Sequence, residues 1–418
     1  MTARTVRRRT RSHAHVTLVS SQLPPGQPPR GQAPLHAVQV LGGGSAGSSA
    51  HVRSLAAGLV ARGVRVTVCA PTEAERTYDF TGTGAAHVAV DRSTDPSSVA
   101  ALRAVCADAD LVHAHGLHAG LRASLALGRR VPFVVTWHTR AHAEGPRAHL
   151  LRLLERRVAK AASILLGTSS DLVDRARQRG ARDARLAAVA LPAPGGCGGT
   201  GDDECDGSGG SDGSEGSDGS GDADGSAASK ARAELGAVGR PLLLAAGALE
   251  RHRGHEVLLD AVRVWRHHEP EPLLVIAGEG PLRPELQRRI EEERLPVLLL
   301  GSREDVAELL AAADLALLPS SWESRSVLAQ EALRAGVPLV ATAVGGTPEL
   351  VGDAAELVPY GDAEALGAAV VRLLGDAGRR AWLVERGVWQ AGTWPTEDAT
   401  VAQVLSVYDE LTSPVRFV

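Results

Sequence analysis

Short runs of apolar residues alternate with helix-length amphipathic segments along most of this 418-residue chain. Runs of four to eight apolar residues suit buried strands, whereas apolar positions three or four residues apart suit helices. Strands that alternate with helices build a parallel sheet with helices on both of its faces. The sequence therefore predicts an α/β fold made of doubly wound, Rossmann-like parallel sheets.

The first series of alternating segments begins near Leu35. A strand over 35–41 is followed by glycines, a helix over 48–62 and a second strand over 64–70. Later segments continue the pattern, with a helix over 150–162 and strands over 111–113, 133–137, 164–167 and 186–191. This order is typical of one doubly wound domain.

The composition changes abruptly at Gly195 to Gly, Ser, Asp and Glu. The tract over 195–226 cannot bury apolar surface, so we expect a disordered insert there. Residues 201–224 hold nine acids and no Lys or Arg, which leaves the remainder at +5 although the chain has a formal charge of -4. The alternation then resumes, with strands expected over 242–246, 273–277, 297–300, 315–319 and 339–341 and a final helix over 401–411.

Composition narrows the classes of protein to consider. Aromatic residues make up only 3% of the chain, which argues against a nucleic-acid surface built from stacked aromatic rings. The first eleven residues hold five arginines but precede no apolar signal core, and no stretch of ~18 apolar residues occurs. The four cysteines lack the CxxC spacing of metal sites and suit reduced thiols. We expect a cytoplasmic protein that binds no nucleic acid.

A glycine cluster, Gly42 to Gly47, separates the first strand from the first helix. Bare backbone N–H groups and a helix N-terminus at such a place can face a phosphate. The cluster contains GxGxxG, but the acid that a dinucleotide site needs at the end of the second strand is absent, because Glu73 comes three residues late. This disfavours a dehydrogenase, while a purely structural turn stays an alternative.

Two glutamates, separated by seven residues, follow the expected strand over 315–319. Glu323 is expected in the loop after that strand, and Glu331 about one and a half turns into the next helix. A carboxylate that accepts hydrogen bonds from two hydroxyls suits a ribose diol or a sugar ring. The alternative is a glutamate that only complements the helix dipole.

The sequence around these glutamates resembles the retaining glycosyltransferases of family 4. The resemblance rests on the Glu-x7-Glu spacing and on the segments EALRAGVPLVAT (331–342), GGTPE (345–349), GALERHRG (247–254) and AGEGP (277–281). In the first half, Gly47 with His51-Val52, VHAHG (112–116) and TWHT (136–139) are similar to further landmarks of the family. The resemblance implies the GT-B fold, in which two Rossmann-like domains face each other across a cleft.

By this resemblance, the chain is a metal-independent hexosyltransferase that moves a sugar from a UDP- or GDP-sugar, with retention, to a small-molecule or lipid-linked acceptor. It implies no cofactor beyond this nucleotide-sugar co-substrate and no metal ligand. The catalytic residues would be His138 and Glu323, and Glu331 would bind the ribose. The diphosphate would lie against Gly43, Gly44, Gly47 and Arg253. The backbone of Ser324, Arg325 and Ser326 would form the loop that faces the donor. The Ala- and Arg-rich composition suggests similarity, within the family, to the actinobacterial enzyme that adds N-acetylglucosamine to inositol phosphate.

Two positions depart from the pattern of the family. The family usually places Arg and Lys five residues apart on the diphosphate, whereas this chain has Ala248 and Arg253. The usual aromatic residue after the first glutamate is replaced within Ser324-Arg325-Ser326. A degenerate protein that binds a nucleotide-sugar without turnover is therefore an alternative, and a sugar-nucleotide epimerase of the same architecture is a third, less favoured one.

Two further features carry weaker hypotheses. His113, His115 and His118 are close in sequence, but a metal site is disfavoured because no acid or cysteine cluster accompanies them. A basic amphipathic helix over 145–162 could contact an anionic membrane, or could be an ordinary helix with a solvated face.

The expected organisation has four parts. A disordered leader over 1–34 precedes an N-terminal acceptor domain over 35–194. The acidic insert over 195–226 leads to a C-terminal nucleotide-sugar domain over 227–394. By the family resemblance, a helix at about 395–418 crosses back and completes the first domain.

Overall fold

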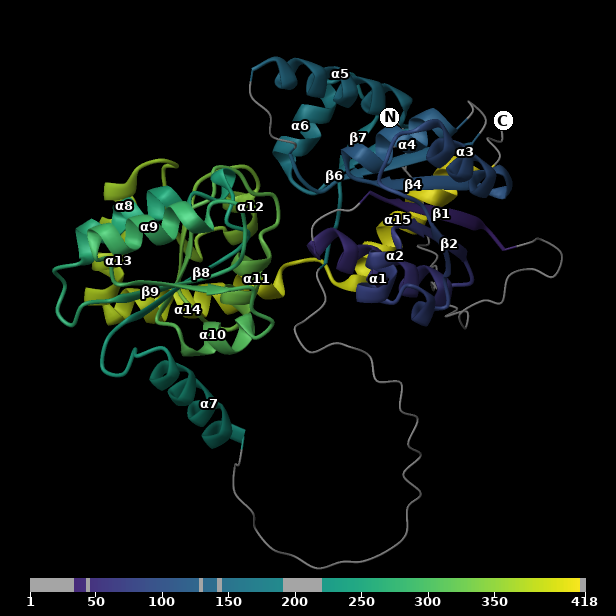
Figure 1. The fold of residues 1–418 in the computed structure, drawn as a ribbon. Coiled ribbons are helices and arrows are strands. Elements are labelled where there is room, and N and C mark those ends of the chain that lie inside the picture. The colour runs from purple at the N-terminus through teal and green to yellow at the C-terminus, as the bar shows by residue number, and fades with distance from the viewer. Residues whose placement is uncertain (1–33, 43–45, 128–130, 141–144, 191–219, 414–418) are drawn as a thin grey trace, which may run out of the picture. The chain divides into compact units, whose positions relative to one another are not determined.

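The computed structural model describes residues 34–42, 46–127, 131–140, 145–190 and 220–413. They form two parallel sheets, each with its own set of helices (Figure 1). The strand orders are β3-β2-β1-β4-β5-β6-β7 and β10-β9-β8-β11-β12-β13. In both sheets the first strand lies inside and the chain winds outward to either side, so the predicted doubly wound α/β class is confirmed.

The first sheet and its helices come from the first half of the chain. The strands are β1 (His36–Leu41), β2 (Arg65–Ala70), β3 (Ala86–Ala89), β4 (Leu111–His115), β5 (Phe133–Trp137), β6 (Ile164–Gly167) and β7 (Ala184–Leu186). The helices are α1 (Ala46–Ala61), α2 (Thr72–Tyr78), α3 (Pro96–Val105), α4 (Leu117–Ala126), α5 (Pro146–Ala161) and α6 (Ser170–Gln178).

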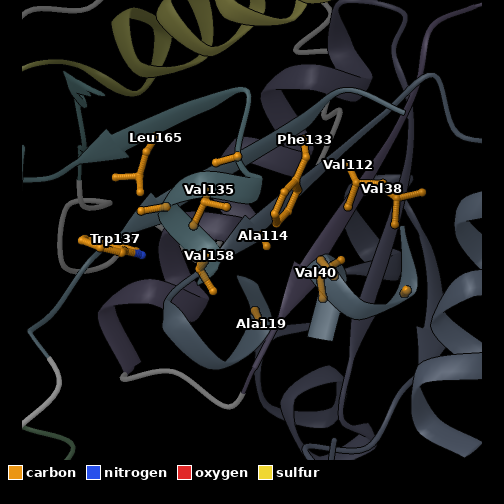
Figure 2. Close-up of a cluster of buried hydrophobic side chains, with 14 of the residues drawn as sticks. Val38, Val40, Val112, Ala114, Ala119, Phe133, Val135, Trp137, Val158 and Leu165 are labelled. Atoms are coloured by element: carbon orange, nitrogen blue, oxygen red, sulfur yellow. The ribbon is translucent and has the colours of Figure 1, made fainter. Parts of the chain in front are cut away.

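The strands of the first sheet are apolar because helices cover both of its faces. Side chains alternate between the two faces of a strand, so Val38 and Val40 of β1 join one core while Ala37 and Leu41 join another. Figure 2 shows the first of these cores, where the β1 valines lie near Val112 of β4. Aliphatic side chains thus fill this core, which explains how a chain with few aromatic residues builds a close-packed interior.

Strand β7 differs from the strand expected over 186–191. It ends at Leu186, where its only neighbour β6 ends at Gly167. Beyond it, the backbone N–H groups of Ala188 and Ala190 donate to side chains of the last helix instead of to a strand. Only the first residue of the expected strand, Leu186, is therefore in β7. The residues after it form a mostly buried connection that contacts α15.

The second sheet repeats the arrangement. Its strands are β8 (Leu242–Ala246), β9 (Leu273–Ala277), β10 (Val297–Gly301), β11 (Leu315–Leu318), β12 (Leu339–Thr342) and β13 (Ala355–Val358). Its helices are α7 (Ser220–Glu234), α8 (His255–Trp265), α9 (Arg283–Glu293), α10 (Val306–Ala312), α11 (Val327–Arg334), α12 (Thr347–Val351), α13 (Ala363–Gly375) and α14 (Ala377–Gly392).

Helix α7 corrects the end of the expected insert. The insert was expected to be disordered to residue 226, but the helix begins at Ser220. Alanine, which has the highest helix propensity, is frequent from residue 223 onward. Ala228 and Ala231 also pack against a core of the second sheet. The remainder of the insert, over 195–219, lies outside the described residues, as does nearly all of the leader.

The last helix, α15 (Glu397–Thr412), packs with the first half of the chain. Val401, Val404, Val407 and Tyr408 belong to the same core as α1, β1 and β2. Figure 1 shows this helix, in yellow, beside α1. Among the residues that the structure describes, no helix is long and apolar enough to cross a membrane.

Candidate nucleotide-sugar site

A cleft of about 250 Å3 lies between loops from the two halves of the chain. The first half contributes Gly47, Ser48, His138, Thr139, Thr168 and Val189. The second half contributes Ala246, Gly247, Arg253, Trp322, Glu323, Ser324, Arg325, Ser326, Val327 and Leu328. Most of these residues follow the carboxyl ends of central strands, where doubly wound sheets bind their ligands.

Most of the site residues expected from the sequence lie together in this cleft. They are Gly47, His138, Arg253, Glu323, Ser324, Arg325 and Ser326. Glu331 is half-buried in α11 and is not part of the lining. Burial raises the pKa of its carboxyl, and the charge of Arg334 opposes that shift. Gly43 and Gly44 lie outside the described residues.

Glu323 and Arg253 contact each other in the cleft. Arg253 Nη1 donates to Glu323 Oε1, and Ser320 Oγ donates to the same oxygen at 2.8 Å. Gly254 follows with a φ of 73°, and a Cβ there would lie 2.0 Å from the Pro319 carbonyl oxygen. The backbone after β8 therefore approaches the loop after β11 closely, and this brings the guanidinium to the carboxylate.

The loop after β12 holds the backbone of Glu323. Gly346 N donates to the Glu323 carbonyl oxygen at 2.8 Å. Gly345 has a φ of 52°, and a Cβ there would lie 2.0 Å from that same oxygen. The paired glycines of the GGTPE segment are thus explained by this close approach.

Trp322 and Ser324 connect the loop after β11 to the first half. The indole of Trp322 is buried among core residues of the first half, and its Nε1 donates to Asp171 Oδ2 at 2.8 Å. The Ser324 hydroxyl lies 2.6 Å from Thr168 Oγ1 and 3.2 Å from Ser169 Oγ. Residues before and after Glu323 are therefore fixed by contacts with the loop after β6.

His138 lies at the cleft end of a hydrogen-bonded chain. His115 Nε2 lies 2.9 Å from Gln39 Oε1, and an amide oxygen only accepts, so this nitrogen carries the proton. His115 Nδ1 must then accept, and His138 Nε2 donates to it at 3.2 Å. His138 Nδ1 is left as the acceptor nitrogen of a residue that lines the cleft.

The chain continues from Gln39 to the last helix. Gln39 Nε2 donates to the Tyr408 hydroxyl at 2.8 Å. That hydroxyl lies 2.8 Å from His113 Nδ1, and His113 Nε2 lies 2.7 Å from Thr136 Oγ1. The Tyr408 hydroxyl, which accepts from Gln39, has His113 Nδ1 as the partner for its own proton, so a residue of α15 belongs to the chain that reaches His138.

Burial keeps the histidines of this region neutral. It lowers the pKa of His51 to about 4 and that of His113 to about 3. The pKa values of His115 and His138 are held well below 6.5, mainly by burial and further by neighbouring imidazoles. A neutral His138 can accept a hydrogen bond at pH 7, which an imidazolium cannot.

Three of these histidines also lie close enough to share a metal ion. The ligand atoms of His51, His115 and His138 are within 4.8 Å of one another. Both ring nitrogens of His115 are already hydrogen-bonded, so a metal would have to displace the bond to His138. His118, which is close to His113 and His115 in the sequence, is exposed and is not part of this cluster.

Sequence reasoning missed Gln39, His51, His115 and Tyr408 as parts of the site. A signal was present, because Gln39 interrupts an apolar run and His113 and His115 interrupt another. These two runs pair as neighbouring strands, with Gln39 opposite His113. Polar residues inside central buried strands need partners and so indicate a network.

Two family models match the chain. Residues 46–192 match a glycosyl transferase 4-like domain, and residues 240–376 match the glycosyl transferases of group 1. An N-acetyl-alpha-D-glucosaminyl L-malate synthase of Bacillus anthracis is 37% identical over 112 residues, 26% of this chain and 29% of the relative. A D-inositol 3-phosphate glycosyltransferase of Xylanimonas cellulosilytica is 34% identical over 208 residues, 46% of this chain and 47% of the relative.

The match to each of these curated relatives thus spans less than half of the relative's length. Solved structures cover far more of the chain. The crystal structure of Anabaena HepE in complex with UDP has a TM-score of 0.71 at 18% identity, over 90% of this chain and 100% of that chain. At this identity the likeness shows the fold. The chain belongs to glycosyltransferase family 4, the glycosyl transferases of group 1, and has the GT-B fold.

Proposed function

We propose that the protein transfers a hexose-type sugar from a UDP- or GDP-sugar to an acceptor hydroxyl, with retention and without a metal ion. The observation that carries this proposal is the meeting of His138, Arg253 and Glu323 in one cleft. These side chains come from both halves of a GT-B fold and offer a hydrogen-bond acceptor, a cation and a carboxylate. This set suits a neutral sugar linked to a diphosphate.

Each group has a role in the charge that develops during transfer. A sugar that leaves a nucleoside diphosphate makes the phosphate more negative, and Arg253 with the N-terminus of α11 meets this charge. Glu323 accepts hydrogen bonds from sugar hydroxyls, and neutral His138 accepts one more through Nδ1. In family 4, the leaving phosphate assists deprotonation of the acceptor, so no separate general base is required.

The ion pair between Arg253 and Glu323 means that each group is occupied before the donor binds. Donor binding must replace this contact with a bond from Arg253 to phosphate and bonds from sugar hydroxyls to Glu323. In such an exchange Arg253 stays paired with a negative charge and Glu323 stays hydrogen-bonded, which limits the desolvation cost.

The test is release of nucleoside diphosphate from a panel of UDP-, GDP-, ADP- and TDP-sugars with EDTA present. We expect one donor to turn over, and turnover to fall at least about 100-fold in Glu323→Gln and Arg253→Ala. Glu292→Gln and Arg288→Ala are matched controls, because these two residues form an exposed pair on α9. Loss of all turnover in EDTA, with recovery in Mg²⁺ or Mn²⁺, would contradict the metal-independent reaction.

A specific observation keeps the degenerate binder as the second candidate. Ala248 stands where the family usually has a cation, and its side chain is exposed, so that position supplies no charge. Saturable binding of one nucleotide-sugar without turnover would support this candidate. Ala248→Arg restores the missing cation, so it should raise turnover if the protein is an enzyme and should produce no turnover if it only binds the nucleotide-sugar.

The acceptor is proposed only as a class. The names of the two relatives refer to L-malate and to D-inositol 3-phosphate, so both are included in the acceptor panel. A lipid-linked acceptor fits another feature, because Leu150 and Leu153 of α5 are 58% and 56% exposed beside exposed arginines. We propose that 145–162 contacts anionic membranes, which sedimentation with phosphatidylglycerol vesicles tests against phosphatidylcholine vesicles.

A further inference from the structure

Arg325 lines the cleft but has no partner for its charge among the described residues. Its Nε and Nη2 atoms are buried and make no hydrogen bond. It also forms no ion pair with any described carboxylate, although Glu349 lies near enough to act on it electrostatically. Arg325 as a whole is half-buried. Two buried guanidinium nitrogens without partners are costly and are usually explained by a ligand.

The environment of Arg325 makes a purely structural role unsatisfactory. Burial lowers the pKa of its guanidinium, and the nearby charge of Arg334 lowers it further. Arg334, by contrast, lies over the ring of Trp394 at 5.4 Å. Nothing comparable holds the side chain of Arg325 in the described part of the chain, whereas its backbone carbonyl accepts from Gln330 Nε2.

The neighbours of Arg325 in the sequence belong to the same cleft. Glu323 precedes it by two residues, and Ser326 after it caps α11 by accepting from Ala329 N at 3.3 Å. The adjacent Ser324 hydroxyl contacts Thr168 of the first half. A ligand group that reaches Arg325 is therefore close both to Glu323, which is proposed to bind the sugar, and to the loops of the first half.

We propose that the guanidinium of Arg325 binds an oxyanion, a phosphate or a carboxylate, carried by a ligand in this cleft. If the oxyanion belongs to the donor diphosphate, Arg325 supplies the second cation that the chain lacks at Ala248. A guanidinium binds such groups through two parallel hydrogen bonds, so unpartnered nitrogens in a lining residue fit this chemistry. The inference rests on the proposed function, and it adds a specificity for anionic ligands to that site.

The oxyanion has two possible sources, the donor diphosphate and the acceptor. Calorimetric titrations distinguish them with UDP, GDP, inorganic phosphate, D-inositol 3-phosphate and uncharged inositol as probes. The variants are Arg325→Gln, which removes the charge, and Arg325→Lys, which keeps it without the planar fork. Arg386→Gln is the matched control, since Arg386 lies outside the cleft lining and pairs with Asp353.

We expect Arg325→Gln to weaken the binding of at least one anionic probe by about ten- to a hundred-fold, with partial recovery in Arg325→Lys. Weaker binding of UDP or GDP assigns the oxyanion to the donor. Weaker binding of D-inositol 3-phosphate alone, with nucleoside diphosphate binding intact, assigns it to the acceptor. Unchanged binding of every anionic probe would overturn the proposal.

Stability separates ligand binding from a structural role. Removal of an unpartnered buried charge should leave the thermal midpoint of ligand-free Arg325→Gln unchanged or higher, because no native contact is lost. A fall of several degrees, beyond that of Arg386→Gln, would identify Arg325 as structural. The titrations need no turnover, so the proposed transferase activity can fail while the oxyanion site stands.

Discussion

Polar residues inside the central strands form a hydrogen-bonded chain that ends at the cleft. The hydroxyl of Tyr408 accepts from Gln39 and donates to His113, and Gln39 in turn fixes the proton on His115. His138 is thereby left with Nδ1 as its acceptor. A side chain of α15 is therefore linked by hydrogen bonds to a residue at the carboxyl end of β5.

The substitution Tyr408→Phe tests this arrangement. It leaves Gln39 Nε2 and His113 Nδ1 without their buried partner, so we expect a loss of about 1–3 kcal/mol in the free energy of unfolding. The freed amide no longer fixes His115, and kcat should fall while the KM for the donor changes little. Denaturant titration and steady-state kinetics measure the two effects.

Tyr78→Phe is the matched control, because Tyr78 packs against the same core and stacks on Phe80, while its hydroxyl makes no hydrogen bond within the described residues. Equal losses in stability and in kcat for both variants would contradict a specific role of the Tyr408 hydroxyl.

The buried histidines predict that stability falls on acidification. In the unfolded chain His51 and His113 gain protons below a pKa of 6.5, but in the folded chain only at about 4 and about 3. Between these values the unfolded state binds more protons, so stability is full above pH 6.5 and falls as the pH drops. For His51 alone the loss approaches roughly 3 kcal/mol by pH 4.

Thermal midpoints between pH 7.5 and 4 measure this dependence. His113→Asn should flatten the slope whatever its effect at neutral pH, whereas His118→Asn, at an exposed position, should not. A midpoint that stays constant from pH 7 to 5 would show that the histidines are not buried as neutral groups.

Among the elements, α5 and α6 are joined by a buried carboxylate. Glu155 of α5 is 3% exposed and accepts from Arg175 Nη2 and Arg179 Nε, both at 2.7 Å. These arginines lie on α6 and directly after it. The contact fixes the helix that carries the exposed leucines of the proposed membrane surface.

Glu155→Gln should therefore lower the free energy of unfolding by about 3–5 kcal/mol, because two arginines lose their buried counterion. Glu292→Gln breaks an exposed pair with Arg288 and should change it by less than about 1 kcal/mol. Denaturant titrations of both variants give the comparison. A Glu155→Gln loss as small as that of the control would mean that the pairing contributes little.

The elements also show where sequence reasoning succeeds and where it fails. Strands such as β5, β6, β8 and β9 have the predicted bounds, because both faces are buried and their apolar runs are continuous. The run over 186–191 failed, because an edge position offers one neighbour and side chains of α15 bond the rest of its backbone. A local pattern does not encode a partner 210 residues away.

For the whole molecule, the alternation of strands and helices predicted the class of fold, and the family resemblance named many residues that line the cleft. Neither predicted their contacts. The resemblance assigned Arg253 and Glu323 to different parts of the donor, whereas the structure pairs them. Gln39 and Tyr408 are separated by 369 positions, and no periodicity connects them. Geometry of this kind follows from how the sheets and α15 pack, and only the folded chain reveals it.

The position of α15 has a consequence for synthesis on the ribosome. Because Val401, Val404, Val407 and Tyr408 fill the core of the first half, that core stays incomplete until these residues have emerged, after the whole second sheet. The second sheet, whose described strands end at Val358, has all of its strands available earlier. The half that is made first is thus the half that finishes folding last, and until then its apolar surface needs protection from aggregation.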